Sequence, residues 1–355
     1  MGLPEILIEF KAKAQTAVRR SQNGIVAVIL LDNTKTATSY KYSYESDINT
    51  ADWTAGSLEL LNLVFKGSPN TVLVERLGDK VTLQDALKRL KNKKWNWLTF
   101  PQIDKTLGDV ETVKNWIISQ RAAHKTFKAV LPHTDNTGNF NDEGIIEFAT
   151  DNIKMSTKTF SVCEYCARIA GMLAGLSYTQ SATYYVLSEA ESITESTAPD
   201  NDIDAGKLIL INDGEKIKIA RGVNSLHILS DGKTEDMKKI KIIDGIDMIR
   251  DDIRTTFEDN YIGINNSYAN KLVFISAINQ YFKTLARQGV LYDEYENTAE
   301  IDVDAQRNYL AEKYDISDYT DEEILKAKTG SYIFVSAKIQ FNDAIEDLHF
   351  TVNME

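Results

Sequence analysis

The stretch that decides the fold lies near the end of the chain, where residues 332–352 read YIFVSAKIQFNDAIEDLHFTV. Over residues 332–341 apolar side chains occupy every second position, which is the period of a β-strand with one buried face. Asn342 and Asp343 supply a turn. The alternation then resumes at Leu348, Phe350 and Val352. This pattern predicts a C-terminal β-hairpin, and so apolar a strand at a chain end must either complete its own sheet or pair with another chain.

A second terminal strand is predicted at the other end of the chain. Residues 5–10 read EILIEF, and one face of this strand would carry Ile6, Ile8 and Phe10. Chain ends fray unless something binds them. Two apolar terminal strands therefore favour arms that add to the sheets of neighbouring molecules. The alternative is that both strands complete sheets of their own chain.

Length, charge and cysteine content limit the class of protein. With 355 residues the chain has room for two domains, and its net charge of −12 argues against a protein whose main role is to bind nucleic acid. No apolar run reaches the roughly 18 to 20 residues that span a bilayer, so no direct membrane insertion is expected. The run IVAVILL at residues 25–31 is too short for a signal peptide and predicts a buried strand. Two cysteines without an export signal indicate a reducing compartment.

Strands and helices alternate over residues 25–195. Strands are predicted at residues 25–31, 71–76, 95–101 and 127–132. Helices are predicted at residues 58–66, 82–90, 109–124 and 161–175. This order predicts an α/β domain with a mainly parallel sheet, and Thr82 is expected to cap the second helix. The polar and acidic segment 188–206 places the domain boundary between residues 195 and 196.

Residues 196–345 show a different pattern, typical of an α+β domain. Strands at residues 207–211 and 216–220 flank Asp213 and Gly214, a dipeptide that favours a hairpin turn. Two amphipathic helices are predicted, at residues 237–259 and 267–288, with Gly289 ending the second. The predicted fold class is thus an α/β domain followed by an α+β domain. Extended strand arms are predicted at residues 1–24 and 346–355.

The sequence contains no pattern typical of a catalytic, cofactor or metal site. Cys163 and Cys166 form a lone CxxC motif, and zinc would need a second pair of ligands that the chain does not supply. A packed helix explains the two cysteines better than redox chemistry does. Asp200, Asp202 and Asp204 resemble the start of a calcium loop, but the expected glycine and glutamate do not follow in register. We interpret them as a solvated linker, and we expect no cofactor.

Several segments resemble contractile tail sheath proteins, the family found in myophages and phage-tail-like bacteriocins. In the second half the resemblance rests on the Asp213-Gly214 hairpin leading to VNSL (223–226), IIDGIDMIRDDI (242–253) leading to YIGINN (261–266), QYFKTLARQGV (280–290), and the C-terminal hairpin. In the first half, AGMLAGLSYTQSAT (170–183) resembles the small-residue helix and Ser/Thr segment of the family.

The resemblance implies a homo-oligomer of stacked rings or a helical sheath around an inner tail tube. The conserved domain, residues 196–345, would face the tube, and the variable α/β domain, residues 25–195, would lie outside. Contraction would drive the tube through a target cell envelope. Baseplate and tail terminator proteins would be further partners. The particle would be a virion tail or a phage-tail-like particle assembled in the cytoplasm of the host bacterium.

The resemblance also assigns roles to particular residues. The inter-subunit arms would use Ile6, Ile8, Phe10, Leu348, Phe350 and Val352. The candidate tube contacts are Lys238, Lys239 and Lys241. The hydrogen bonds of an added strand, about 0.5–1.5 kcal/mol each, roughly cancel the 1–2 kcal/mol per residue needed to order it. Burial of each large apolar side chain adds about 1.5–3 kcal/mol. The alternative function is an α/β enzyme or ligand-binding protein with a C-terminal oligomerisation domain.

Overall fold

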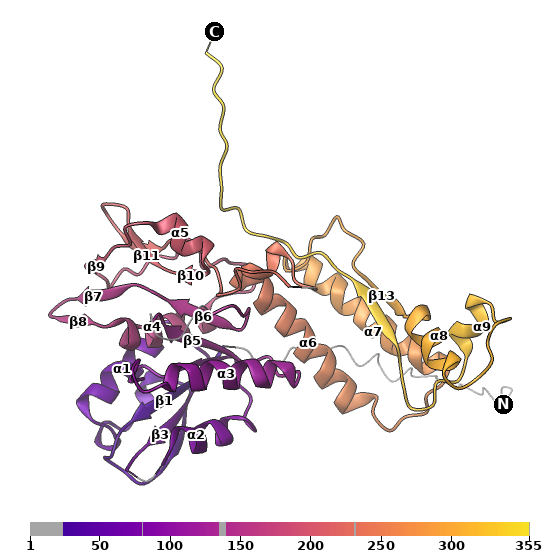
Figure 1. The fold of residues 1–355 in the computed structure, drawn as a ribbon, viewed down its shortest axis with the longest axis horizontal. Coiled ribbons are helices and arrows are strands. Elements are labelled where there is room, and N and C mark those ends of the chain that lie inside the picture. The colour runs from indigo at the N-terminus through magenta and orange to yellow at the C-terminus, as the bar shows by residue number, and fades with distance from the viewer. Residues whose placement is uncertain (1–23, 80, 135–139, 231, 355) are drawn as a thin grey trace, which may run out of the picture. The chain divides into compact units, whose positions relative to one another are not determined.

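The computed structural model describes residues 24–79, 81–134, 140–230 and 232–354 (Figure 1). Within these residues the chain forms two compact units. The first, which we call the α/β unit, contains residues 24–247 and 343–354. The second, the α+β unit, contains residues 248–342. The predicted combination of an α/β fold and an α+β fold is confirmed.

A seven-stranded sheet forms the centre of the α/β unit, in the order β10-β6-β5-β4-β1-β3-β2. The strands are β1 (Ile25–Leu31), β2 (Ser39–Tyr42), β3 (Thr71–Leu77), β4 (Trp97–Thr99), β5 (Lys128–Pro132), β6 (Ile145–Phe148) and β10 (Lys207–Leu208). Only β2 pairs antiparallel with its neighbour in this sheet. All residues of β1 except Leu31 are buried, as expected for a parallel strand covered on both faces.

Helices cover both faces of the sheet. α1 (Ala55–Phe65) and α4 (Val162–Gly175) pack on one face, and α2 (Leu83–Leu90) and α3 (Asp109–Ala122) pack on the other. Thr82 caps α2 as predicted, because its side chain accepts a hydrogen bond from the backbone of Asp85. The small residues of α4 allow a close approach to α1. A Cβ at Gly171 would lie only 2.0 Å from the carbonyl oxygen of Val64.

The α/β unit extends beyond the predicted boundary between residues 195 and 196. A second, three-stranded sheet contains β7 (Asp151–Met155), β8 (Lys158–Phe160) and β9 (Ser192–Thr194). The predicted hairpin is present as β11 (Leu210–Asn212) and β12 (Ile217–Ile219), with Gly214 at a φ of 95°. Both strands bury apolar side chains in the core of the α/β unit. The acidic segment is therefore a surface excursion within this unit, and it contains the short helix α5 (Pro199–Asp204).

In the α+β unit, α7 packs against a two-stranded sheet and contacts α6. α6 (Ile240–Asn260) begins in the α/β unit and continues into this one, and α7 (Tyr268–Arg287) is followed by Gly289 at a φ of 73°, as predicted. β13 (Thr298–Ile301) pairs antiparallel with β14 (Val335–Lys338). Two shorter helices, α8 (Val303–Ala311) and α9 (Asp321–Lys326), lie between the two strands in the sequence.

The predicted C-terminal hairpin is wrong. Only residues 335–338 of the predicted strand are in β14, and their partner is β13, which the sequence analysis did not identify. Beyond Asn342 the described residues contain no strand, and Figure 1 shows them as an extended segment. Four residues, TAEI at 298–301, are too few to show a period from sequence alone. Asn342 and Asp343 therefore carry the chain onward and do not reverse it.

Buried ion pairs hold the first turns of α6 in the α/β unit. Arg121 of α3 contacts Asp247, with 2.8 Å between Nη1 and Oδ2. The Nζ atom of Lys128 on β5 lies 3.2 Å from the same Oδ2 atom and 3.0 Å from Oδ1 of Asp244. The side chains of Arg121 and Asp247 are only 7% and 3% exposed. Burial disfavours the charge on Lys128, but the two carboxylates outweigh it and raise the pKa of this lysine.

The replacement Asp247→Asn tests this anchor. We expect the free energy of unfolding of the α/β unit to fall by about 3 kcal/mol, because two buried cations lose a shared carboxylate. Urea unfolding followed by tryptophan fluorescence measures this unit, since the four tryptophans are at positions 53, 95, 97 and 116.

The matched control is Lys154→Gln. It breaks the 3.2 Å pair with Glu191, in which both side chains are about half exposed, and should cost less than about 1 kcal/mol. A loss in Asp247→Asn no larger than the loss in this control would contradict the proposed role of the buried pairs.

Candidate assembly site

The predicted C-terminal arm is an extended segment with exposed apolar side chains. Leu348, Phe350 and Val352 are 84%, 79% and 65% exposed. Within the described part of the chain, residues 345–354 make no backbone hydrogen bond. A row of alternating apolar side chains in contact with water is costly, and an unpaired backbone beside it can accept a strand partner. The other predicted arm residues, Ile6, Ile8 and Phe10, lie outside the described residues.

The base of this segment is bound to the α/β unit through Glu346. The hydroxyl groups of Ser181 and Thr183 both donate hydrogen bonds to Oε1 of Glu346, at 2.7 Å each. The side chain of Glu346 is only 9% exposed. Thr183 is held in place because its Oγ1 atom also accepts a hydrogen bond from the backbone of Gly222, at 2.9 Å. The Ser/Thr segment after α4 thus forms a binding site for one carboxylate.

Two further ion pairs flank this carboxylate. Arg221 donates a hydrogen bond of 2.6 Å to Asp347, which raises the pKa of Arg221. Lys239 pairs with Asp343. Partial burial opposes the ionisation of Asp343, but the hydrogen bond from Lys239 lowers its pKa overall. Since Asp347 is largely exposed, its pair is weak. We call Ser181, Thr183, Arg221, Lys239 and the three acids they bind the arm anchor.

Sequence reasoning did not find the arm anchor. Ser181 and Thr183 lie more than 160 positions from Glu346 in the chain, so no local pattern connects them. The available signal was the acidic pair Glu346-Asp347, which directly precedes the apolar positions 348, 350 and 352. Charged residues at that position indicate a contact, but they do not identify its partner.

The three lysines predicted to contact the tube do not form one open basic surface. Lys238 lies in a short 3-10 helix, Glu235–Lys238, and pairs with Glu235 at 2.8 Å. Lys239 belongs to the arm anchor. Lys241 is 9% exposed, and its burial lowers its pKa. Lys238 is therefore the member of the group that is neither buried nor part of the arm anchor.

Polar side chains of the chain itself make hydrogen bonds at the place where a doubly wound sheet usually binds its ligand. The strand order reverses between β1 and β4, and ligands bind at such points beyond the carboxyl ends of the strands. Gln102 occupies this place, with hydrogen bonds to the backbone N and O atoms of Leu31 at 2.8 and 3.2 Å. Burial opposes the ionisation of Asp32, but a backbone hydrogen bond from Thr54 contributes to a strongly lowered pKa. Both polar side chains are thus engaged internally.

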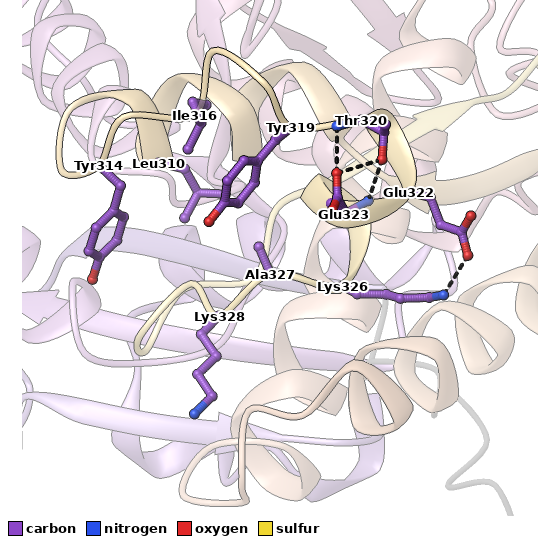
Figure 2. A pocket seen from close by; sticks show the side chains of 10 residues that line it. All are labelled: Leu310, Tyr314, Ile316, Tyr319, Thr320, Glu322, Glu323, Lys326, Ala327 and Lys328. Carbon is purple, nitrogen blue, oxygen red and sulfur yellow. Dashed lines mark hydrogen bonds and ion pairs between the residues drawn. The ribbon is translucent and has the colours of Figure 1, made fainter.

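A pocket of about 710 Å³ opens beside α9 in the α+β unit (Figure 2). Its floor is apolar, and its rim carries two carboxylates. The hydrogen bond from Lys326 lowers the pKa of Glu322, and the hydrogen bond from the backbone of Thr320 lowers the pKa of Glu323. Both acids are ionised and paired at neutral pH. Neither has the raised pKa that a general acid needs.

The cysteine pair lies in the first turns of α4 as two free thiols. Burial raises the pKa of Cys163 to about 11 and also raises that of Cys166. Both are protonated thiols at neutral pH, so neither is an activated nucleophile. Across residues 24–354, leaving out the undescribed gaps, no group of His, Cys, Asp and Glu side chains could hold a metal ion. No helix in the same residues is long and apolar enough to cross a membrane.

Comparison with known proteins gives consistent results. The family described as the phage tail sheath C-terminal domain matches residues 232–355. A tail sheath protein of Clostridium phage phiCD119 is 33% identical over 368 residues, covering 99% of each chain.

Solved structures share the fold at lower identity. The sheath tail protein of Listeria innocua has a TM-score of 0.70 at 15% identity, over 96% of this chain and 97% of that one. The contracted helical sheath of the anti-feeding prophage has a TM-score of 0.71 at 13% identity, over 100% of both chains. With one relative at 33% identity along nearly its whole length, this chain belongs to the tail sheath protein family.

Proposed function

We propose that this structural protein assembles with copies of itself into a contractile sheath around an inner tail tube, and that contraction drives the tube through a target cell envelope. Family membership makes the protein a component of a phage tail or phage-tail-like particle, not an enzyme. The observation that carries the assembly proposal is the exposed apolar segment at residues 345–354, which is anchored at its base but unpaired in the described chain.

The arms are proposed to add as strands to sheets of neighbouring subunits. Residues 346–355 would lend Leu348, Phe350 and Val352, and residues 1–24 would lend Ile6, Ile8 and Phe10. Each buried side chain would contribute about 1.5–3 kcal/mol. Because Glu346 fixes the base of the C-terminal arm, part of its ordering cost is met before pairing.

The sheet of the α+β unit offers an edge for such a strand. The amide of Asn279 bonds to the backbone N and O atoms of Ala299, at 2.6 and 3.0 Å, and so closes the outer edge of β13. Among the described residues, β14 pairs only with β13. We infer that the outer edge of β14 accepts an arm from another subunit.

The further partners are proposed from the family alone. They are the inner tube, the baseplate and the tail terminator, with assembly in the cytoplasm of the host bacterium. Residues 196–345, which include parts of both units, are proposed to face the tube, with Lys238, Lys239 and Lys241 as tube contacts. Nucleic acid and direct membrane insertion have no role in this proposal.

Removal of the apolar face of the arm should prevent assembly. In Leu348→Ser/Phe350→Ser we expect the protein concentration at which tubes form to rise by at least about tenfold. The burial free energy lost with each side chain is larger than about 1.4 kcal/mol, the value that corresponds to a tenfold change. Electron microscopy and sedimentation measure this. The control His349→Ser/Thr351→Ser changes the alternate positions of the same segment and should assemble normally. Equal behaviour of the two variants would show that the apolar face does not make the contact.

Weakening the arm anchor should reduce assembly without unfolding the protein. In Glu346→Gln the buried carboxylate is lost, and we expect greater backbone motion of residues 343–348, measured as a lower heteronuclear NOE, and fewer tubes at a given concentration. Asp347→Asn is the control, because its pair with Arg221 is exposed and contributes little. If the backbone of residues 343–348 moved no more in Glu346→Gln than in Asp347→Asn, the anchor would not hold the arm.

Charge reversal at Lys238 tests the tube contact. Lys238→Glu should weaken co-sedimentation with the tube protein of the same particle, while sheath self-assembly is unchanged. Lys239 and Lys241 are poor test positions, since one belongs to the arm anchor and the other is buried. Glu235→Gln is the control for the loss of the Lys238 ion pair. Unchanged tube binding in Lys238→Glu would contradict the contact.

A further inference from the structure

Two segments of opposite charge lie near opposite edges of the seven-stranded sheet. At the β2 edge, residues 88–94 read KRLKNKK, with five basic residues and no acid. Near the β10 edge, residues 189–204 contain six acidic residues and no Lys or Arg. The chain as a whole has a net charge of −12, so the basic cluster is a local exception.

The basic edge contains a pocket of about 430 Å³ beside strand β2. It is lined by Ser39, Tyr40, Lys41, Lys93 and Lys94, together with the starts of β1 and β3. Arg89 and Lys93 are engaged with the buried carboxylate of Glu75. In the described part of the chain no carboxylate lies within ion-pair distance of the exposed lysines at positions 41, 88, 91 and 94. Several cationic side chains therefore lie at or near the pocket on this edge.

The acidic edge lies at the other end of the same sheet. α5 packs on β10, which is the edge strand opposite β2. Figure 1 shows α5 and α2 at opposite ends of the α/β unit. Three acids of residues 189–204 have partners within the unit. Among the described residues the other three, Glu195, Asp200 and Asp204, are exposed and have no cation within ion-pair distance.

Opposite charges at opposite ends of one unit favour a head-to-tail contact between copies. Such a contact joins two different surfaces of the same molecule, and its repetition generates rings or helical filaments. Like-charged copies repel one another, and a complementary pair of surfaces offsets this repulsion where the copies meet.

We propose that the β2 edge of one subunit binds the acidic residues 195–204 of a neighbouring subunit. The inference rests on the proposed self-assembly and adds a second interface to the arms. Lys41, Lys91 and Lys94 supply the cations, and Glu195, Asp200 and Asp204 supply the carboxylates. The pocket beside β2 receives the acidic segment of the neighbour. Ion pairs at this exposed contact weaken as salt increases.

Charge reversal with a complementary mixture tests the contact in the full-length chain. The basic-reversed variant is Lys41→Glu/Lys91→Glu/Lys94→Glu, which leaves Arg89 and Lys93 with Glu75. The acid-reversed variant is Glu195→Lys/Asp200→Lys/Asp204→Lys. Alone, each variant presents like charges at both edges, so the protein concentration at which tubes form should rise by about tenfold, which corresponds to about 1.4 kcal/mol per subunit. An equimolar mixture places opposite charges at every contact and should restore assembly.

A matched control separates the edge from net charge. Lys125→Glu/Lys283→Glu/Lys328→Glu changes the charge by the same amount at exposed positions outside both charged segments, and it should assemble like the unchanged chain. Circular dichroism of each variant confirms folding.

Failure of the unchanged chain to form tubes would overturn the proposed sheath function itself. Normal assembly of the basic-reversed variant would overturn the charged interface and leave the sheath function standing. The basic-reversed variant could fail to assemble while the acid-reversed variant assembles normally, or the mixture could fail to restore assembly. Either result would show that the pocket binds something other than residues 195–204. Failure of each variant by itself, followed by normal assembly of the mixture, would establish the contact.

Discussion

The rest of the structure depends on the buried ion pairs that the carboxylate of Asp247 makes. This carboxylate lies at the last residue of the α/β unit, one position before the α+β unit begins, within the continuous helix α6. Arg121 and Lys128 hold it from two other elements, α3 and β5. The chain therefore passes between its two units through a helix whose first turns are fixed by buried charge. Replacement of one partner would leave uncompensated charge in the core, so the three residues form one interdependent group.

The chain passes between the units a second time at residues 342–343, and charged residues follow this point as well. Asp343, Glu346 and Asp347 bind the returning chain to the α/β unit, and the apolar positions begin directly after them. The polar residues thus determine where the exposed segment starts, and its apolar residues would give the proposed arm its affinity for a partner. A free arm with the same apolar face would pay a larger ordering cost on binding.

The sequence predicted those features that are local. The parallel sheet was visible because β1 is a continuous apolar run and strand patterns alternate with helix patterns after it. Thr82 and Gly289 mark helix ends by their chemistry. The domain boundary was misplaced because composition shows that residues 188–206 are polar, but not that the strands after them return to the same core. The C-terminal hairpin was wrong because the true partner of β14 is a four-residue strand. The arm anchor was missed because its two sides are far apart in the chain.

The two proposed interfaces differ in physical character, and this difference bears on contraction. Arm pairing rests on buried apolar area and backbone hydrogen bonds, which salt screens little. The charged edges rest on exposed ion pairs, which are weak singly and act over a Debye length of about 8 Å at physiological salt. A sheath that must rearrange its subunits without losing them needs one contact that persists and another that exchanges at low cost. Apolar arms meet the first need, and opposite charges at the two edges of one sheet meet the second.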